Sequence, residues 1–276
     1  MARPHVHDMV ILSVLFATLC LQIGYSRRLS EDINNEVSAI PDGNIANYEY
    51  KNSRDYVKIS QAPIPHIKKN VGSHVEFYCE AMGSPPPTIQ WYKDHMRITE
   101  NESFENSNLI DRTVGLAKVA SRLVINYILP RHQGKYYCVA EAGSERDKAA
   151  TDLIIPNARG REMNFTQLLA NKILGAHHRP RVTFWAPAYM DIIGSDIVLP
   201  CKSVGNPKPD LWWIDPNSKT IEDGMDNGKF VLLPDGELSI RSITWEDMGV
   251  YICMVKNSVG DDSVETFLYP MQESNK

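Results

Sequence analysis

The chain has 276 residues, of which 43% are hydrophobic and 23% charged, so it can bury the core of one large or two ordinary domains. Its formal net charge of −5 lacks the strong basic footprint of a nucleic-acid-binding protein. No apolar stretch reaches the length of about 18 residues that a membrane-spanning helix requires, so no membrane anchor is expected.

The first residues have the pattern of a secretory signal peptide. An apolar run over residues 10–23 is too short to span a bilayer but has the length of a signal h-region. Small residues, Gly24 and Ser26, then offer a cleavage site. The alternative, a buried core helix, is disfavoured because little else would pack around it. We therefore expect a signal peptide over residues 1–26 and a secreted, extracellular protein, with a polar arm over residues 27–60.

The cysteines indicate an oxidising environment. Removal of the signal peptide takes away Cys20 and leaves Cys79, Cys138, Cys201 and Cys253. An even number of cysteines in a secreted chain is typical of disulfides. A zinc site is disfavoured, because the chain contains no C-x-x-C pair.

An internal repeat relates two halves of the chain. When Cys79 is aligned with Cys201, a tryptophan follows each cysteine at the same spacing, and a Tyr-x-Cys motif closes each half. Residues 75–79 and 197–201 alternate between apolar and polar side chains, which predicts half-buried strands. Gly and Pro clusters separate such stretches, so the repeat favours two all-β sandwiches.

The order Cys, Trp, Tyr-x-Cys has a physical meaning in a sandwich. A disulfide between the two cysteines joins the sheets, the tryptophan packs against it, and the tyrosine hydroxyl turns back onto the chain at a corner. We therefore expect disulfides Cys79–Cys138 and Cys201–Cys253. Each closes a loop of roughly 50–60 residues, which the chain-entropy model values at about 4 kcal/mol.

Both halves resemble the intermediate-set immunoglobulin domain. The second half carries the motif most fully: Gly205-x-Pro207-x-Pro209, Trp213, Leu238-x-Ile240 and Asp247-x-Gly249-x-Tyr251-x-Cys253. In the first half His132 stands where the motif has aspartate, so the resemblance does not extend to the ion pair of that corner. The expected fold is all-β, with two tandem immunoglobulin-like sandwiches over residues 61–156 and 180–276.

The segment between the expected domains, residues 157–179, is long for a linker and predicts a short helix. Residues 164–174 place apolar side chains at helical spacing on one face, and Gly175 is a stop signal. This helix is either a spacer packed between the domains or one wall of a ligand groove. In the second case the expected ligand contacts are Phe165, Leu168, Leu169, Ile173, Phe184 and Trp185.

Other motifs point away from catalysis. The chain has no G-x-S-x-G, H-E-x-x-H or phosphate-binding glycine loop. The pair His177-His178 could bind a metal only with two further ligands placed by the fold, so a metal site is disfavoured. No enzymatic activity, cofactor or metal is therefore expected. Asn101 and Asn164 each begin a sequon for N-glycosylation, which a secreted chain could carry.

The second half also resembles a more specific family. Residues 191–201 (DIIGSDIVLPC), 245–249 (WEDMG) and 266–270 (TFLYP) are similar to the insect neural/ectodermal development factors, which are secreted insulin-binding proteins with two immunoglobulin domains. Residues 79–84 and 89–91 carry a looser match in the first half.

This resemblance implies a protein that sequesters an insulin-like peptide hormone and so antagonises insulin receptor signalling and growth. The alternative is a secreted adhesion or guidance protein that binds cell-surface partners, with possible self-association. The polar residues 272–276 carry no anchor signal, which favours a diffusible protein.

Overall fold

The computed structural model describes residues 55–98, 115–156 and 177–272. The expected signal peptide, the expected linker helix and both sequons, at Asn101 and Asn164, lie outside these residues. The described part contains two β-sandwiches, named here domain one (residues 55–156) and domain two (residues 177–272).

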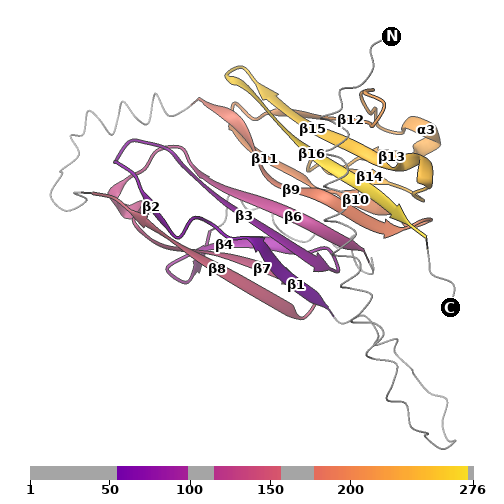
Figure 1. Cartoon of the computed structure of the whole chain (residues 1–276). Helices are drawn as coiled ribbons and strands as arrows, with labels where there is room; N and C mark the ends of the chain where they lie inside the picture. Colours follow the sequence, from indigo (N-terminus) through magenta and orange to yellow (C-terminus); the bar gives the residue numbers. More distant parts are fainter. Residues whose placement is uncertain (1–54, 99–114, 157–176, 273–276) are drawn as a thin grey trace, which may run out of the picture. The chain divides into compact units, whose positions relative to one another are not determined.

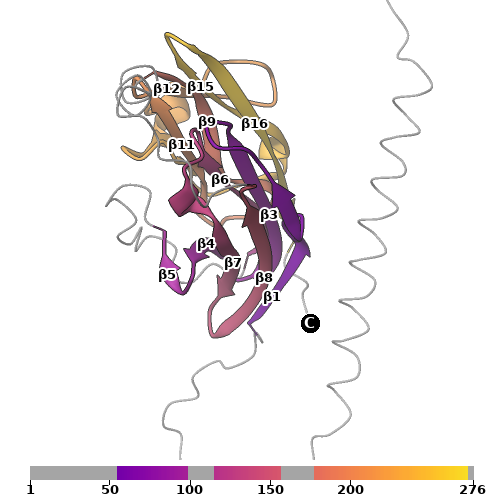
Figure 2. The same cartoon turned by 90° about the vertical axis from the view of Figure 1, so that its left-hand side faces the viewer.

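Domain one consists of two sheet layers, which Figure 2 shows with β1 and β3 in one layer and β4 and β7 in the other. The strand β1 begins inside the segment expected to be a polar arm. One layer contains β1 (Tyr56–Gln61), β3 (Val75–Ser84) and β6 (Leu116–Ile125). The other contains β2 (His66–Lys68), β8 (Glu145–Ile154), β7 (Gly134–Ala142), β4 (Thr88–Lys93) and β5 (Met96–Arg97). A 3₁₀ turn, η1 (Pro130–His132), precedes β7.

Domain two repeats this arrangement (Figure 1). Its larger layer contains β9 (His178–Ile192), β16 (Gly260–Met271), β15 (Gly249–Asn257) and β12 (Asp210–Ile214), with β11 (Cys201–Asn206) paired to β9. The smaller, three-stranded layer contains β10 (Ile197–Leu199), β14 (Leu238–Ile240) and β13 (Phe230–Leu232). A single turn, α3 (Met225–Gly228), and a 3₁₀ turn, η2 (Trp245–Asp247), complete the described residues.

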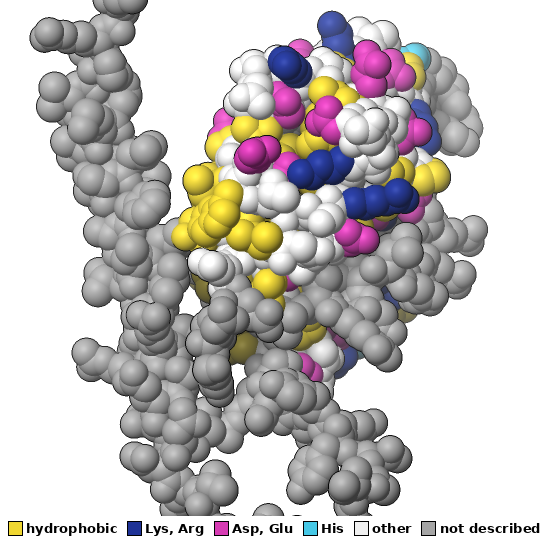
Figure 3. Space-filling view, turned by 90° about the vertical axis from the view of Figure 1, so that its right-hand side faces the viewer, with side chains coloured by type: hydrophobic (Ala, Val, Ile, Leu, Met, Phe, Trp, Pro, Cys, Tyr) yellow, Lys and Arg dark blue, Asp and Glu magenta, His cyan; other side chains and the backbone are white. Residues whose placement is uncertain are grey.

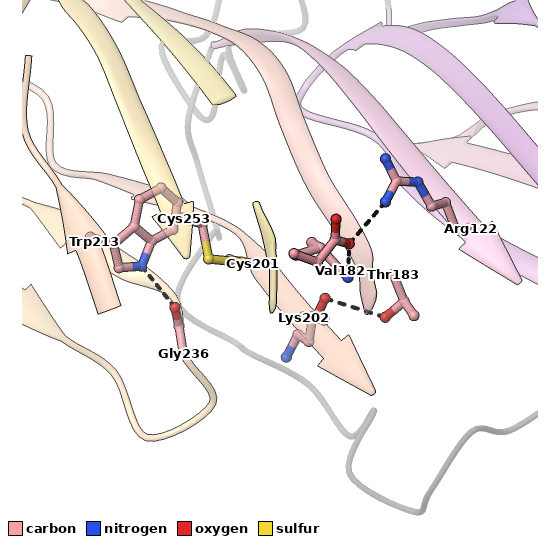
Figure 4. The surroundings of a disulfide bond; sticks show 9 residues. Arg122, Val182, Thr183, Cys201, Lys202, Trp213, Gly236 and Cys253 are labelled. Carbon is pink, nitrogen blue, oxygen red and sulfur yellow. Dashed lines mark hydrogen bonds and ion pairs between the residues drawn. A yellow bond between two sulfur atoms is a disulfide. The ribbon is translucent and has the colours of Figure 1, made fainter. Parts of the chain in front are cut away.

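A disulfide crosses the core of each domain, and both predicted pairings are confirmed: Cys79 bonds Cys138, and Cys201 bonds Cys253. All four cysteines are fully buried. The tryptophan expected beside each disulfide is also in the core. Figure 4 shows Trp213 next to the second bond, where its indole N–H donates to the carbonyl of Gly236 over 2.9 Å. The fold class predicted from the repeat is therefore correct.

Each domain also has the expected tyrosine corner. The hydroxyl of Tyr136 donates to the carbonyl of His132 over 2.6 Å, and the hydroxyl of Tyr251 donates to the carbonyl of Asp247 over 3.1 Å. Burial, with Asp94 nearby, raises the pKa of Tyr136 to about 12. Both phenols therefore stay protonated donors throughout the neutral range.

Replacement of Tyr136 by phenylalanine is expected to cost about 1 kcal/mol of domain-one stability, because the partly buried carbonyl of His132 loses its donor. Denaturant unfolding measures the difference. Tyr137→Phe, one residue away on the half-buried outer side, is the matched control and should change stability by less than about 0.5 kcal/mol. Equal losses in the two variants would contradict the role assigned to the corner.

One sheet runs through both domains. β6 of domain one pairs antiparallel with β9 of domain two, with Lys118 opposite Ala188, and the result is a sheet of eight strands. The register shifts between Lys118 and Ala120. On one side of this shift β9 pairs with β11, and on the other side it runs parallel to β16. The sequence pattern predicted the strands but not this pairing.

Charged side chains reinforce the junction between the domains. The carboxylate of Asp262 accepts the backbone N–H of Val182 over 2.9 Å and an N–H of Arg122 over 3.2 Å. Arg181 lies 3.6 Å from the same carboxylate and donates to Glu76 over 2.8 Å. In Figure 4, the dashed lines from Arg122 and Val182 end on the same carboxylate oxygen. Asp262 thus joins β16 and β9 of domain two to β6 of domain one.

Candidate functional site

The outer side of β15 carries apolar residues that do not pack into the core. Alternate residues of this strand, Tyr251 and Cys253 among them, point inward and are buried. Val250 and Ile252 therefore point outward, because successive side chains of a strand face opposite sides. Val250 is 37% exposed although it is a large apolar residue.

Neighbouring strands continue this apolar surface. Val250 lies opposite Phe267 of β16, and Phe267 in turn lies opposite Ala188 of β9. On the other side, Ile252 lies opposite Ile214 of β12. Residues directly opposite each other in a sheet have side chains in contact distance, so these apolar groups are neighbours across four strands, while the exposed Glu265 of β16 lies opposite Ile252.

The turn η2 adds the most exposed aromatic ring of this surface. Trp245 is 48% exposed, and its indole meets the ring of Tyr269 edge-on, with 6.0 Å between centroids. Met248, at the end of the turn, is 44% exposed. Asp247 fixes the turn by accepting the backbone N–H of Thr244 over 2.6 Å. We call the surface formed by these side chains the apolar face: Trp245, Met248, Val250, Ile252, Phe267 and Tyr269.

The apolar face differs from ordinary surface hydrophobicity by its continuity. Single exposed apolar residues are common on proteins and need no explanation. A contiguous apolar patch with aromatic rings is instead typical of a protein-binding surface. Figure 3 shows one group of hydrophobic side chains at the left of the described surface, while further hydrophobic and charged side chains are interspersed over the rest of that view.

Within residues 55–98, 115–156 and 177–272, no group of three or more His, Cys, Asp or Glu side chains could hold a metal ion. In the same ranges no helix is long and apolar enough to cross a membrane. The apolar face can bury a complementary surface of a partner. Its exposed aromatic rings supply large contact areas at low cost in side-chain entropy.

Two of the ligand contacts expected from the sequence lie in β9. Trp185 is 6% exposed, and its ring centroid lies 4.6 Å from the guanidinium carbon of Arg122 and 6.1 Å from the ring of Tyr78. Phe184 is half-buried, opposite Ser121 of domain one. Trp185 thus fills the junction between the domains. A ligand contact by either residue stays a prediction.

The other four expected contacts, Phe165, Leu168, Leu169 and Ile173, lie outside the described residues. The structure does not bring them to the apolar face or exclude them from it. Their place in a ligand groove also stays a prediction.

Sequence reasoning missed the apolar face, although β15 carried a signal. The run Val250–Val255 is apolar on both sides of the strand, whereas a strand with one solvated side should alternate. Apolar residues at both the inward-facing and the outward-facing positions of a strand indicate one of two things. Either the strand is buried on both sides, or its outer face binds a partner. In this domain the second layer covers only one side of β15.

The model of the immunoglobulin domain family matches two segments of the chain, residues 58–141 and 179–257. The chain belongs to the immunoglobulin domain family. Each matched segment includes both cysteines of one disulfide and the tyrosine corner between its sheets. The tandem arrangement inferred from the repeat is thereby confirmed.

Comparison with known proteins also confirms the more specific resemblance. The chain is 28% identical to the neural/ectodermal development factor IMP-L2 of Drosophila melanogaster over 98% of this chain and 97% of that protein. The crystal structure of neural ectodermal development factor IMP-L2 matches with a TM-score of 0.63, covering 80% of this chain and 97% of the solved one. Zwei Ig domain protein zig-4 of Caenorhabditis elegans is 28% identical over 76% of this chain and 78% of its own length.

Proposed function

We propose that this immunoglobulin-domain protein is secreted, binds an insulin-like peptide hormone through the apolar face of domain two, and so lowers insulin receptor signalling and growth. It acts by sequestration and not by catalysis. The apolar face is the observation that carries the binding role. The hormone class rests on the resemblance to the insect neural/ectodermal development factors, whose likeness extends over nearly the whole chain.

The physical requirements of sequestration suit this surface. A complex of nanomolar affinity needs about −12 kcal/mol of net binding free energy. A few desolvated aromatic anchors usually supply most of such energy, with a polar rim that excludes water. Trp245 and Tyr269 are already in edge-on contact in the free protein, so these rings lose little conformational freedom on binding.

Secretion is the second part of the proposal. The expected signal peptide over residues 1–26 and the two buried disulfides both fit an oxidising, extracellular setting. N-terminal sequencing of protein recovered from culture medium checks the point. A mature chain that begins near Arg27 is the expected result, and retention of Met1 in a cell-bound protein would contradict it.

Titration calorimetry of the secreted protein with an insulin or insulin-like peptide tests the binding itself. Saturable binding between nanomolar and low micromolar affinity supports sequestration. If a protein with both disulfides formed binds no such hormone, the proposal fails. The adhesion or guidance role then becomes the better explanation of the apolar face, and cell-surface proteins are the partners to test.

A further inference from the structure

The two tyrosine corners are closed by different side chains. In domain two, the Asp247 carboxylate accepts the backbone N–H of Thr244 over 2.6 Å and pairs with the ammonium of Lys229 over 2.6 Å. A carboxyl group has acceptor oxygens in either protonation state. The bond to Thr244 therefore survives a change of pH.

In domain one, an imidazole takes the place of this carboxylate. His132 ends η1, as Asp247 ends η2, and its Nδ1 accepts the backbone N–H of Leu129 over 3.1 Å. A neutral imidazole has one nitrogen with a free lone pair, so this bond places the proton on Nε2. Arg131 Nε lies 3.5 Å from that Nε2 but cannot donate to a nitrogen that already carries a hydrogen. The Leu129 bond therefore depends on a deprotonated Nδ1.

The charges around His132 oppose its protonation. Arg131 is its neighbour on η1, and Lys93 ends β4; the charges of both act on the imidazole. The carboxylate of Asp94, next to Lys93 in the chain, pairs with Lys93 over 2.7 Å and accepts the Lys135 backbone N–H over 3.3 Å. Burial, and then the charges of Arg131 and Lys93, lower the pKa of His132 below its ordinary value.

The sign of the pH effect follows from proton binding. The unfolded chain takes up the histidine proton near its ordinary pKa of about 6.5, and the folded domain does so only at lower pH. Between these two pKa values the unfolded state binds more protons, so acid favours unfolding. The stability that His132 contributes is complete above about pH 6.5 and is lost as pH falls towards the folded pKa.

We propose that His132 makes the corner of domain one a pH-sensitive element, which holds η1 less firmly as pH falls below about 6.5, while the corner of domain two stays closed. When both ring nitrogens carry protons, Nδ1 becomes a donor that faces the N–H of Leu129, and the hydrogen bond is replaced by repulsion. The added charge lies beside Arg131 and Lys93. The inference does not depend on the hormone-binding role.

Hydrogen exchange of the whole secreted protein at about pH 7.4 and pH 5.5, corrected for intrinsic rates, tests this proposal. Peptides that cover residues 128–137 are expected to lose protection roughly two- to tenfold in acid, the range for loss of one hydrogen bond. Peptides that cover the equivalent corner, residues 243–252, are expected to keep theirs and serve as the internal control.

His132→Asp and His132→Asn provide matched variants, because a side-chain oxygen at this position already caps the corner of domain two. Both are expected to remove the difference in protection between the two pH values. NMR titration of the wild-type imidazole needs no variant and should show the Nε2–H tautomer. Protection that does not change with pH, an unchanged response in the variants, or titration at or above pH 6.5 would each overturn the proposal.

Discussion

Replacing Trp245 and Tyr269 together with alanine is expected to weaken hormone binding on the order of 100-fold or more. Truncation of a central aromatic anchor typically costs 2 kcal/mol or more, about 30-fold in affinity. Both rings lie on the outer side of domain two, and Trp245 is about half exposed, so their loss removes contact area from the face and not from the core. Calorimetry with the insulin-like peptide measures the change.

The control for this double variant is an exposed apolar residue of the other domain. Met96, on the short strand β5 of domain one, is 74% exposed, more than any side chain of the apolar face. Met96→Ala should leave hormone affinity unchanged. If a folded Trp245→Ala, Tyr269→Ala protein binds hormone as the wild type does, the apolar face is not the hormone site, and the six residues predicted from the sequence become the first alternative.

Replacement of Asp262 by alanine should lower stability by about 3 kcal/mol and weaken the coupling between the domains. The change leaves the half-buried guanidinium of Arg122 without its carboxylate and the N–H of Val182 without its acceptor. Since these contacts tie β16 and β9 to β6, the two domains are expected to unfold in separate calorimetric transitions. The wild-type protein should unfold in one.

Asp261→Ala is the neighbouring control for this variant. Asp261 is exposed at the start of the same strand, so its loss should change stability by less than about 0.5 kcal/mol. Separate transitions in the wild-type protein would show that the two domains unfold independently. A single transition unchanged by Asp262→Ala would show that the paired strands, and not this carboxylate, carry the coupling.

The sandwiches could be predicted because their determinants are local and repeated. Cys79 and Cys201, with the tryptophan and Tyr-x-Cys that follow each, stand at the spacings typical of immunoglobulin sandwiches. His132 was also recognised from position alone as a departure from the aspartate of the motif. Its replacement bond to Leu129 could not be predicted, because it depends on the three-dimensional geometry of η1.

The pairing of β6 with β9 could not be read from the sequence. Alternation of apolar residues predicts which side of a strand is buried, but it does not predict which other strand pairs with its edge. For the same reason Trp185 could be assigned to a first strand but not to the junction with Arg122 and Tyr78. Trp245 belonged to a recognised motif, yet its exposure follows from the turn η2. The periodicity of apolar residues does not predict such a turn.

The shared ladder between β6 and β9 has a consequence for solubility. Each of these strands would otherwise border its own sandwich with a row of unsatisfied N–H and C=O groups, which is a template for aggregation. Their pairing covers part of both edges at once, residues 116–121 of β6 and 184–190 of β9. Either domain produced alone would expose one of them, and we expect such fragments to form intermolecular strand pairs at concentrations at which the two-domain chain stays dispersed.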